Sequence, residues 1–379
     1  MPVWLFFLAL AVFAQGTSEF VLTGLLTAIS RELNVSLGEA GMLTSAFAVG
    51  MIIGAPLMAA VGRKFPPRLT LGLFLLMFIL AHIVGATTGS FAVLLLSRIV
   101  SAVANAGFLA VTLSVVERGV PADRRAKALA VILSGTTVSL IIGVPVGAWV
   151  GNALDWRSTL WMIAVVCVPA LCAVIWSVPS HATETSGTDL KTEFAAMRNR
   201  AVFRIVVLTV LVNAGTFGAF TYLGVMAADG ACLTGGMVPV LLAMFGVGAF
   251  VGVGLAGRYG DSSWRRFIDI AGPLAVAGWA LLAVGGAHPV LIWPLTFCAG
   301  LVSFGLGSML ITRVVATTRG APTMGGSVAT VALNVGACIG PMVAGRSLGI
   351  LGNQGPAVVA ALAVALAVAT WTAVRQRIA

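Results

Sequence analysis

The sequence has few charged residues, few cysteines and few histidines. Of its 379 residues only 9% are charged and 59% are hydrophobic, whereas soluble domains average about 25% charged residues. This scarcity of charge excludes a soluble globular protein. The five cysteines form no CxxC pair, and the three histidines, His82, His181 and His288, are scattered along the chain. No disulfide framework or metal site is therefore expected.

Sequence motifs of common enzymes and nucleotide-binding proteins are also missing. The chain contains no HExxH motif and no Walker A sequence, so neither zinc-dependent hydrolysis nor ATP hydrolysis is expected. Gly252-x-Gly254-x-x-Gly257 matches a dinucleotide fingerprint, but it lies within an apolar run and follows no strand. Close helix packing explains it better. We expect a protein that is not an enzyme and uses no cofactor, with a membrane-bound enzyme as a distant alternative.

Long apolar runs are the main feature of the chain. A membrane-spanning helix needs roughly 20 apolar residues, and the runs between polar breaks predict twelve. The first run lacks a basic leader and a cleavage site, so we expect it to be a span and not a signal peptide. The expected ranges are 4–28, 38–61, 69–88, 91–117, 126–151, 158–178, 203–227, 234–257, 267–287, 290–313, 325–348 and 355–375.

Basic residues are distributed unevenly between the predicted connections. Of the 22 lysines and arginines, 18 lie in the even-numbered connections or at the C-terminus, three lie in the odd-numbered connections, and Arg98 lies inside a span. The positive-inside rule then places both termini in the cytoplasm. The same topology explains the net charge of +10 without a nucleic-acid partner.

The two halves of the sequence resemble each other. Gly- and Pro-rich runs surround Pro145 in the fifth span and Pro341 in the eleventh, 196 positions apart. A basic loop follows both the second and the eighth spans at nearly the same offset, which indicates a duplicated six-helix unit. We expect 1–178 and 203–379 to form two six-helix, pseudo-symmetric bundles around a central cavity, joined by a cytoplasmic linker at 179–202. This is a transporter architecture.

Two charged residues lie deep within predicted spans. Glu19 is in the first span and Arg98 in the fourth, and counting ~1.5 Å per helical residue places both at a similar depth. Each would cost roughly 3 kcal/mol or more if it faced lipid, so both should face the protein interior as partners or near-partners. In the second half Gly218 stands near the place of Glu19, so proton chemistry is expected in the N-terminal half.

Several short motifs resemble the major facilitator superfamily. They include the loop after span 2, Leu94-x-x-x-Arg98 in span 4, and Gly143-Val144-Pro145-Val146-Gly147 in span 5. Gly16-Thr17-Ser18-Glu19-Phe20, Leu43-Thr44-Ser45-Ala46-Phe47-Ala48, Ala104-Asn105-Ala106-Gly107-Phe108 and Leu133-Ser134-Gly135-Thr136-Thr137 more narrowly resemble chloramphenicol-resistance exporters of actinomycetes, in the twelve-spanner drug:proton antiporter branch. The loop after span 2 departs from the family, because Arg63 occupies the usual position of an aspartate.

The resemblance implies proton-coupled efflux by alternating access across the bacterial inner membrane. Spans 1 and 4 line the central cavity in this superfamily, which would allow Glu19 to exchange a proton and Arg98 to tune that exchange. A fixed ion pair that only joins the two spans is the alternative. The implied partners are a small amphiphilic drug such as chloramphenicol, protons and the lipid bilayer, and the protein is expected to be a monomer. A sugar or metabolite exporter and a passive facilitator or channel remain alternatives.

Further candidate residues fall into two groups. Aromatic and amide side chains at middle depth are candidates for binding substrate, with packing or helix-to-helix bonding as the alternative: Gln15, Phe47, Asn105, Phe108, Asn213, Phe217, Phe220, Tyr222, Phe245 and Asn334. The loop and Gly/Pro motifs are candidates for conformational change: Arg63, Lys64, Gly143, Pro145, Gly147, Arg258, Asp261, Gly340 and Pro341.

Overall fold

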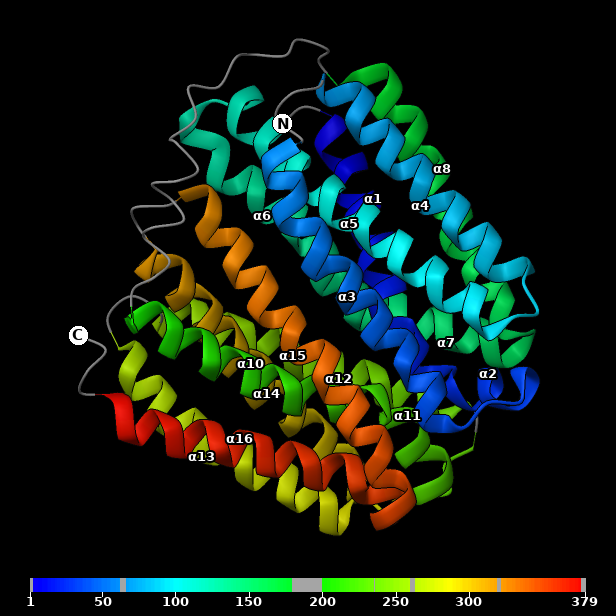
Figure 1. The fold of residues 1–379 in the computed structure, drawn as a ribbon, viewed down its shortest axis with the longest axis vertical. Helices are drawn as coiled ribbons and strands as arrows, with labels where there is room; N and C mark the ends of the chain where they lie inside the picture. Colours follow the sequence, from blue (N-terminus) through cyan, green and yellow to red (C-terminus); the bar gives the residue numbers. More distant parts are fainter. Residues whose placement is uncertain are drawn as a thin grey trace.

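A computed structural model describes residues 3–61, 66–178, 200–234, 236–259, 263–318 and 322–375. Within these ranges the regular structure is entirely helical (Figure 1). Most of the predicted linker, and with it the proposed boundary between two bundles, lies outside the described residues. We use "N-terminal half" for α1 to α8 and "C-terminal half" for α10 to α16.

The helices follow the predicted apolar runs closely. The N-terminal half consists of α1 (Trp4–Phe20), η1 (Val21–Gly24), α2 (Leu26–Leu33), α3 (Leu37–Val61), α4 (Pro67–Thr87), α5 (Phe91–Gly119), α6 (Ala122–Val138), η2 (Ser139–Gly143), α7 (Val144–Ala153) and α8 (Trp156–Ser177). The C-terminal half consists of α10 (Arg200–Thr221), α11 (Leu223–Val225), η3 (Met226–Gly230), α12 (Met237–Tyr259), α13 (Trp264–Gly285), α14 (Ile292–Thr317), α15 (Pro322–Leu351), η4 (Gly352–Gln354) and α16 (Gly355–Val374).

Eleven candidate membrane spans are found among the described residues. The last, Gly326–Val374, is 49 residues long and includes most of α15 and all of α16. These two helices are separated at Gly352, whose φ of 67° is a left-handed conformation that glycine adopts readily. Twelve separate spans and the symmetry of two bundles stay predictions.

Local sequence explains where several helices begin and end. Pro67 and Pro356 lie in the first turns of α4 and α16, where a missing N–H costs no intrahelical bond. Asp155 caps α8 by accepting a hydrogen bond of 2.6 Å from the Ser158 N–H. The left-handed Asn34, at φ 52°, follows the end of α2.

Three predicted spans are interrupted by irregular turns. The span expected at 4–28 changes to a 3-10 turn after Phe20, and the span expected at 203–227 is interrupted at Tyr222. The span expected at 126–151 contains a π-helical turn, η2, directly before Pro145. The predicted ranges do not mark these turns, although Trp4–Gly24 and Lys127–Ala153 are each found as one candidate span.

The two halves diverge toward the end of the molecule where α1 begins and α16 ends, and they meet at the opposite end, near α2, α7 and α11 (Figure 1). At the meeting end, a Cβ added to Gly224 would lie 2.3 Å from the Thr23 carbonyl oxygen. A Cβ on Gly246 would lie 2.5 Å from the Leu140 carbonyl oxygen. Glycine at these positions lets backbones from opposite halves come into contact.

The outer surface of the helices is strongly apolar. Along α4 the exposed residues Leu69, Leu73, Leu76 and Leu80 recur every three or four positions, so they form one face of the helix. The opposite face contributes Leu75 and Phe78 to the buried core of the N-terminal half. An exposed leucine face of this kind suits contact with lipid tails.

Candidate functional site: a pocket between the halves

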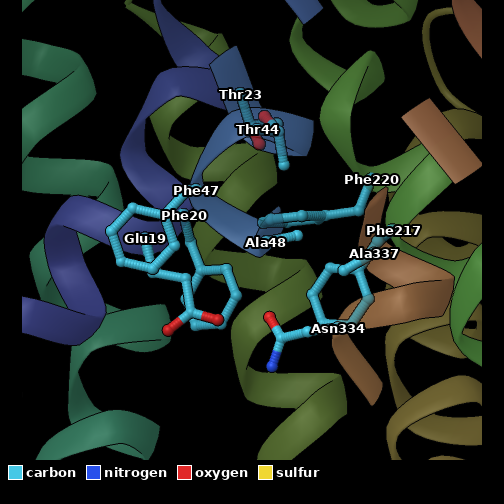
Figure 2. Close-up of a pocket in the computed structure, with 10 residues that line it drawn as sticks. All are labelled: Glu19, Phe20, Thr23, Thr44, Phe47, Ala48, Phe217, Phe220, Asn334 and Ala337. Atoms are coloured by element: carbon cyan, nitrogen blue, oxygen red, sulfur yellow. The ribbon is translucent and has the colours of Figure 1, made fainter. Parts of the chain in front are cut away.

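A pocket lies between the two halves and receives side chains from both (Figure 2). It encloses about 310 Å³ of space not filled by protein atoms, including space open at its mouth. Its lining combines one carboxylate, one amide, two threonines and several aromatic rings. The lining residues are Glu19, Phe20, Thr23, Thr44, Phe47, Ala48, Phe217, Phe220, Asn334 and Ala337.

Glu19 lies one residue before the end of α1 and is partly buried. Figure 2 shows its carboxylate near the side chains of Phe20, Phe47 and Asn334. Within the described part of the chain, this carboxylate has no hydrogen bond and no ion pair within 4.0 Å. Glu19 is thus an acid that lines the pocket without a fixed partner.

Arg98 is on α5 and is almost fully buried, with 2% of its surface exposed. Its Nη1 donates to the Ser18 hydroxyl and its Nη2 to the Ser18 carbonyl oxygen, both at 2.7 Å. The guanidinium carbon lies 4.6 Å from the centre of the Phe47 ring, which adds a cation–π interaction. The arginine is therefore attached to α1 at the residue before Glu19.

His82 is a member of this site that the sequence interpretation did not select. It is on α4, 2% exposed, and its Nε2 lies 2.7 Å from the Ser18 hydroxyl. Its Nδ1 lies 2.8 Å from the Phe78 carbonyl oxygen. The available signal was an ionisable residue in the middle of the predicted span 69–88, since such residues in membrane helices commonly mark functional sites.

Aromatic rings form the pocket wall contributed by the C-terminal half. Phe217 stacks on Phe20 with ring centres 5.9 Å apart, and Phe220 meets Phe20 edge-on at 6.1 Å. Behind this wall Phe245 stacks on Phe220 at 4.6 Å. Stacked and edge-on pairs are favourable beyond the burial of their surface, so these contacts stabilise the wall.

Of two candidate amides, one lines the pocket and the other is buried elsewhere between helices. Asn334 lines it, while its Nδ2 donates to the Thr330 carbonyl oxygen at 2.9 Å within α15. Asn213 is 5% exposed and bonds to Thr209 within α10 at 2.8 Å. An amide whose nitrogen donates to a carbonyl of its own helix keeps its oxygen free to accept a hydrogen bond. For Asn334 this oxygen is next to the pocket.

Other candidates for substrate binding lie outside the pocket lining. Phe108 is fully buried in the core of the N-terminal half, and Asn105 donates to the Met51 sulfur at 3.7 Å. Gln15 is 1% exposed, and neither the nitrogen nor the oxygen of its amide has a hydrogen-bond partner among the described residues. Tyr222 lies where the halves meet, and its hydroxyl donates to the Pro341 carbonyl oxygen at 3.1 Å.

The glycines of the conformational motifs lie at tight helix contacts. A Cβ on Gly143 would lie 2.0 Å from the Thr17 hydroxyl, and one on Gly147 would lie 2.5 Å from Val21. These contacts place α1 and η1 directly against η2 and α7, on either side of Pro145. The motif thus holds the helix that contains Glu19.

The remaining motif residues are distributed over both halves. In the C-terminal half a Cβ on Gly340 would lie 2.1 Å from the Ala214 carbonyl oxygen, and Pro341 lies inside α15. Arg258 is exposed at the end of α12. Three residues of the predicted charged loops, Arg63, Lys64 and Asp261, lie outside the described residues.

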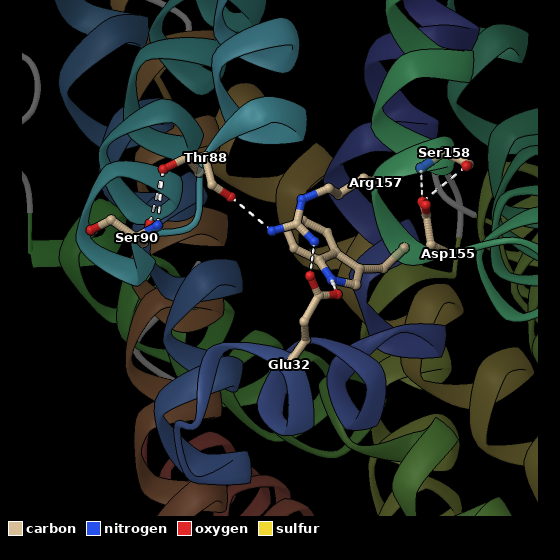
Figure 3. Close-up of polar contacts among 7 residues, drawn as sticks. Glu32, Thr88, Ser90, Asp155, Arg157 and Ser158 are labelled. Atoms are coloured by element: carbon tan, nitrogen blue, oxygen red, sulfur yellow. Dashed lines mark hydrogen bonds and ion pairs between the residues drawn. The ribbon is translucent and has the colours of Figure 1, made fainter.

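A separate polar cluster joins α2, α8 and the connection between α4 and α5, at the end of the molecule where the halves meet (Figure 3). Arg157 forms an ion pair with Glu32, and its Nη2 donates to the Thr88 carbonyl oxygen at 2.9 Å. The Trp156 indole donates to the second Glu32 oxygen at 2.6 Å. Because this cluster links α2, α8 and the α4–α5 connection, it braces the N-terminal half.

Next to this cluster Asp155 caps α8. Its carboxylate accepts hydrogen bonds from the Ser158 N–H at 2.6 Å and from the Ser158 hydroxyl at 2.9 Å (Figure 3). Hydrogen bonds to the charged form of a carboxyl stabilise that form. The backbone bond first, and then the hydroxyl bond, hold the pKa of Asp155 below its usual value.

Comparisons with known proteins decide the family. The model of the Major Facilitator Superfamily matches residues 8–341. The chain belongs to this superfamily. It is a multi-pass membrane transporter and not an enzyme. Over the described ranges no group of three or more histidine, cysteine or acidic side chains is placed to bind a metal.

Relatives and solved structures support the same assignment. The chain is 49% identical to a chloramphenicol resistance protein of Streptomyces lividans over 97% of this chain and 95% of that one. It is 29% identical to the inner membrane transport protein YdhP of Escherichia coli K12, covering 89% and 87%. Two solved structures share the fold: a bacterial homologue of the human lysosomal transporter Spinster, with 15% identity, TM-score 0.79 and coverage of 98% and 96%, and the nucleoside transporter NupG, with 13% identity, TM-score 0.77 and coverage of 98% of both chains.

Proposed function

We propose that this transporter exports a small amphiphilic antibiotic in exchange for protons, and that chloramphenicol is the first compound to test. The proposal depends most on one observation: the pocket between the halves contains a single carboxylate, Glu19, facing aromatic rings. Apolar walls with a few polar groups are the usual environment for a drug-sized ligand. The similarity to a chloramphenicol resistance protein of Streptomyces lividans supports this substrate class.

Glu19 is the proposed carrier of the proton. Its carboxylate lines the pocket and has no fixed hydrogen-bond partner among the described residues, so a proton can bind there without breaking a structural bond. Arg98 adds a positive charge on the same side, one residue away at Ser18. Drug entering the pocket then displaces the proton, and a proton from the other side of the membrane returns the carrier to its starting state.

Alternating access explains how both ligands reach one pocket. The halves diverge at the end where α1 begins (Figure 1), and the distribution of basic residues places this end in the cytoplasm. The proposal therefore takes the cytoplasmic side as the side on which the two halves lie farther apart. The contacts between the halves include the hydrogen bond of 2.8 Å that the Ser45 hydroxyl donates to the Cys338 carbonyl oxygen. Rocking of one half against the other would open that contact.

The test is uptake of labelled chloramphenicol by inside-out membrane vesicles that contain the protein. With an acidic interior the vesicles should accumulate the drug above its external concentration, and a protonophore should abolish this accumulation. Equilibration without accumulation would favour a passive facilitator. Accumulation of labelled sugars but not of chloramphenicol would favour a sugar exporter on the same fold.

A further inference from the structure

Three polar side chains from three helices form a buried chain beside the pocket. Ser18 is on α1 and 0% exposed, while His82 on α4 and Arg98 on α5 are each 2% exposed. All three lie within membrane spans. Burial of a polar group costs free energy unless the group is hydrogen-bonded. The hydrogen bonds among these three side chains therefore fix their positions.

When the imidazole of His82 is neutral, the donor and the acceptor of each hydrogen bond in this chain are determined. His82 Nδ1 lies 2.8 Å from the Phe78 carbonyl oxygen, which can only accept, so Nδ1 carries the proton. His82 Nε2 is then an acceptor for the Ser18 hydroxyl, 2.7 Å away. The Ser18 oxygen in turn accepts from Arg98 Nη1. His82 therefore orients the hydroxyl that binds the arginine.

This arrangement directs Arg98 to the backbone of α1 and not to the neighbouring carboxylate. Both terminal nitrogens of the guanidinium are bonded to Ser18, and Phe47 lies against its face. Glu19 is the next residue along α1, and among the described residues neither terminal nitrogen of Arg98 is bonded to it. The bonds to Ser18 keep Glu19 open to the pocket.

We propose that His82 is a positioning residue for proton exchange: acting through Ser18, it holds Arg98 off Glu19 and leaves the carboxylate available to a proton. The inference rests on the proposed function. Within the described spans packed around Arg98, the titratable side chains at its depth are Glu19 on α1 and His82 on α4. Release of the arginine should thus convert Glu19 into an ion-paired residue.

Reactivity of Glu19 with an apolar carbodiimide tests this without measuring transport. The reagent modifies protonated carboxyls in apolar surroundings, and mass spectrometry of the purified protein quantifies modification at Glu19. His82→Phe removes the acceptor of the Ser18 hydroxyl and should lower the rate of modification by about tenfold, the effect of an adjacent arginine on a carboxyl. His82→Gln keeps an acceptor at the position of Nε2 and should restore the rate to within about twofold.

Two further variants make the result decisive. Ser18→Ala removes the bridging hydroxyl and should have the same effect as His82→Phe, including in the case where the latter does not fold. In the double variant the rate of Glu19 modification should fall little further than in His82→Phe alone, because both changes interrupt the same His82–Ser18–Arg98 hydrogen bonds. Thr70→Val is the matched control: Thr70 is on the same helix, and among the described residues its hydroxyl bonds to the Pro66 carbonyl oxygen, at 2.9 Å, and not to Ser18 or Arg98. It should leave the modification of Glu19 unchanged.

Transport measurements separate this inference from the proposed function. In vesicles, His82→Phe should shift the pH dependence of drug accumulation, whereas Thr70→Val should not. If the wild type shows no gradient-driven transport, the proposed function fails, but the carbodiimide result still reports the position of Arg98. If the wild type is gradient-driven and neither His82→Phe nor Ser18→Ala changes the modification of Glu19, the inference is overturned. A loss of thermal stability alone would make His82 merely structural.

Discussion

The two sides of the pocket differ in chemistry. The N-terminal half provides Glu19 and, behind it, the buried chain of Ser18, His82 and Arg98. The C-terminal half provides Phe217, Phe220, Ala337 and the amide of Asn334, and none of its lining residues is charged. In the proposed mechanism the first side holds the charge and exchanges the proton, while the second offers aromatic rings and one amide to an amphiphilic molecule.

Helix packing in the C-terminal half explains part of this difference. Gly218, near the place that Glu19 takes in the other half, lies against α15, and a Cβ there would be 3.0 Å from the Gly340 carbonyl oxygen. A carboxylate at Gly218 would have to displace that helix. Close packing of α10 on α15 thus disfavours an acid at position 218.

The largest expected effect is the loss of proton coupling in Glu19→Gln. Gln has a similar shape but cannot exchange a proton at this pocket, so drug uptake into vesicles should no longer respond to a pH gradient. The measurement is the ratio of uptake with and without the gradient. Accumulation still driven by the gradient would show that coupling lies elsewhere, and the contrast between the halves would lose its functional meaning.

Glu39→Gln is the matched control for that experiment. Glu39 belongs to the same half but lies at the start of α3, where it forms a capping box with Ser36: its carboxylate accepts from the Ser36 N–H at 2.8 Å. Gln preserves this type of cap. Drug uptake by the Glu39→Gln variant should still respond to the pH gradient.

The sequence predicts the membrane helices well, because they depend on the cost of placing polar groups in lipid. It does not predict the break after Phe20. No proline marks that position, and the turn lies where Gly224 and Thr23 of opposite halves come into contact. Such breaks depend on residues about 200 positions apart in the chain.

Side-chain partners in the site were harder to predict than the site itself. Glu19 and Arg98 were expected to be partners or near-partners, and the arginine is in fact bonded to Ser18, the residue before Glu19. Depth along a helix does not determine which rotamer an arginine adopts. Tyr222 likewise has the amphipathic character of a binding residue, but the break before α11 places it between α3 and α15, bonded to Pro341.

An intermediate effect is expected when the apolar wall is changed. Phe220→Leu removes a ring that lines the pocket and stacks on Phe245, so the KM for chloramphenicol should rise roughly two- to tenfold, the range expected for one aromatic contact. The ratio of uptake with and without a pH gradient should stay unchanged, since Glu19 is intact.

Phe203→Ala provides the control on the same helix. Phe203 is 68% exposed on the outer surface of α10, where it is available to lipid and not to the pocket. Its KM should match the wild type. A change in gradient dependence in Phe220→Leu would contradict the separation of roles between the two halves.

The smallest expected effect concerns Asp155, an acid of the N-terminal half that lies outside the spans. Asp155→Ala removes the cap of α8 and should lower stability at pH 7 by about 1 kcal/mol, a typical value for an N-cap, seen as a lower Tm in detergent. Because hydrogen bonds from Ser158 hold the folded-state pKa below its usual value, the stabilisation is present above the unfolded-state pKa of about 3.9. It is lost as pH falls through the folded-state pKa.

The Tm difference between wild type and Asp155→Ala should therefore shrink in acid, whereas Asp155→Asn, which keeps a neutral cap, should stay close to the wild type at pH 7. Neither variant should alter the response of drug uptake to a pH gradient. If Asp155→Ala uncoupled transport, two acids of the N-terminal half would share the proton, and the pocket carboxylate would not be sufficient. An effect on stability alone would show that Asp155 has a structural role that is distinct from the role proposed for Glu19 in the pocket.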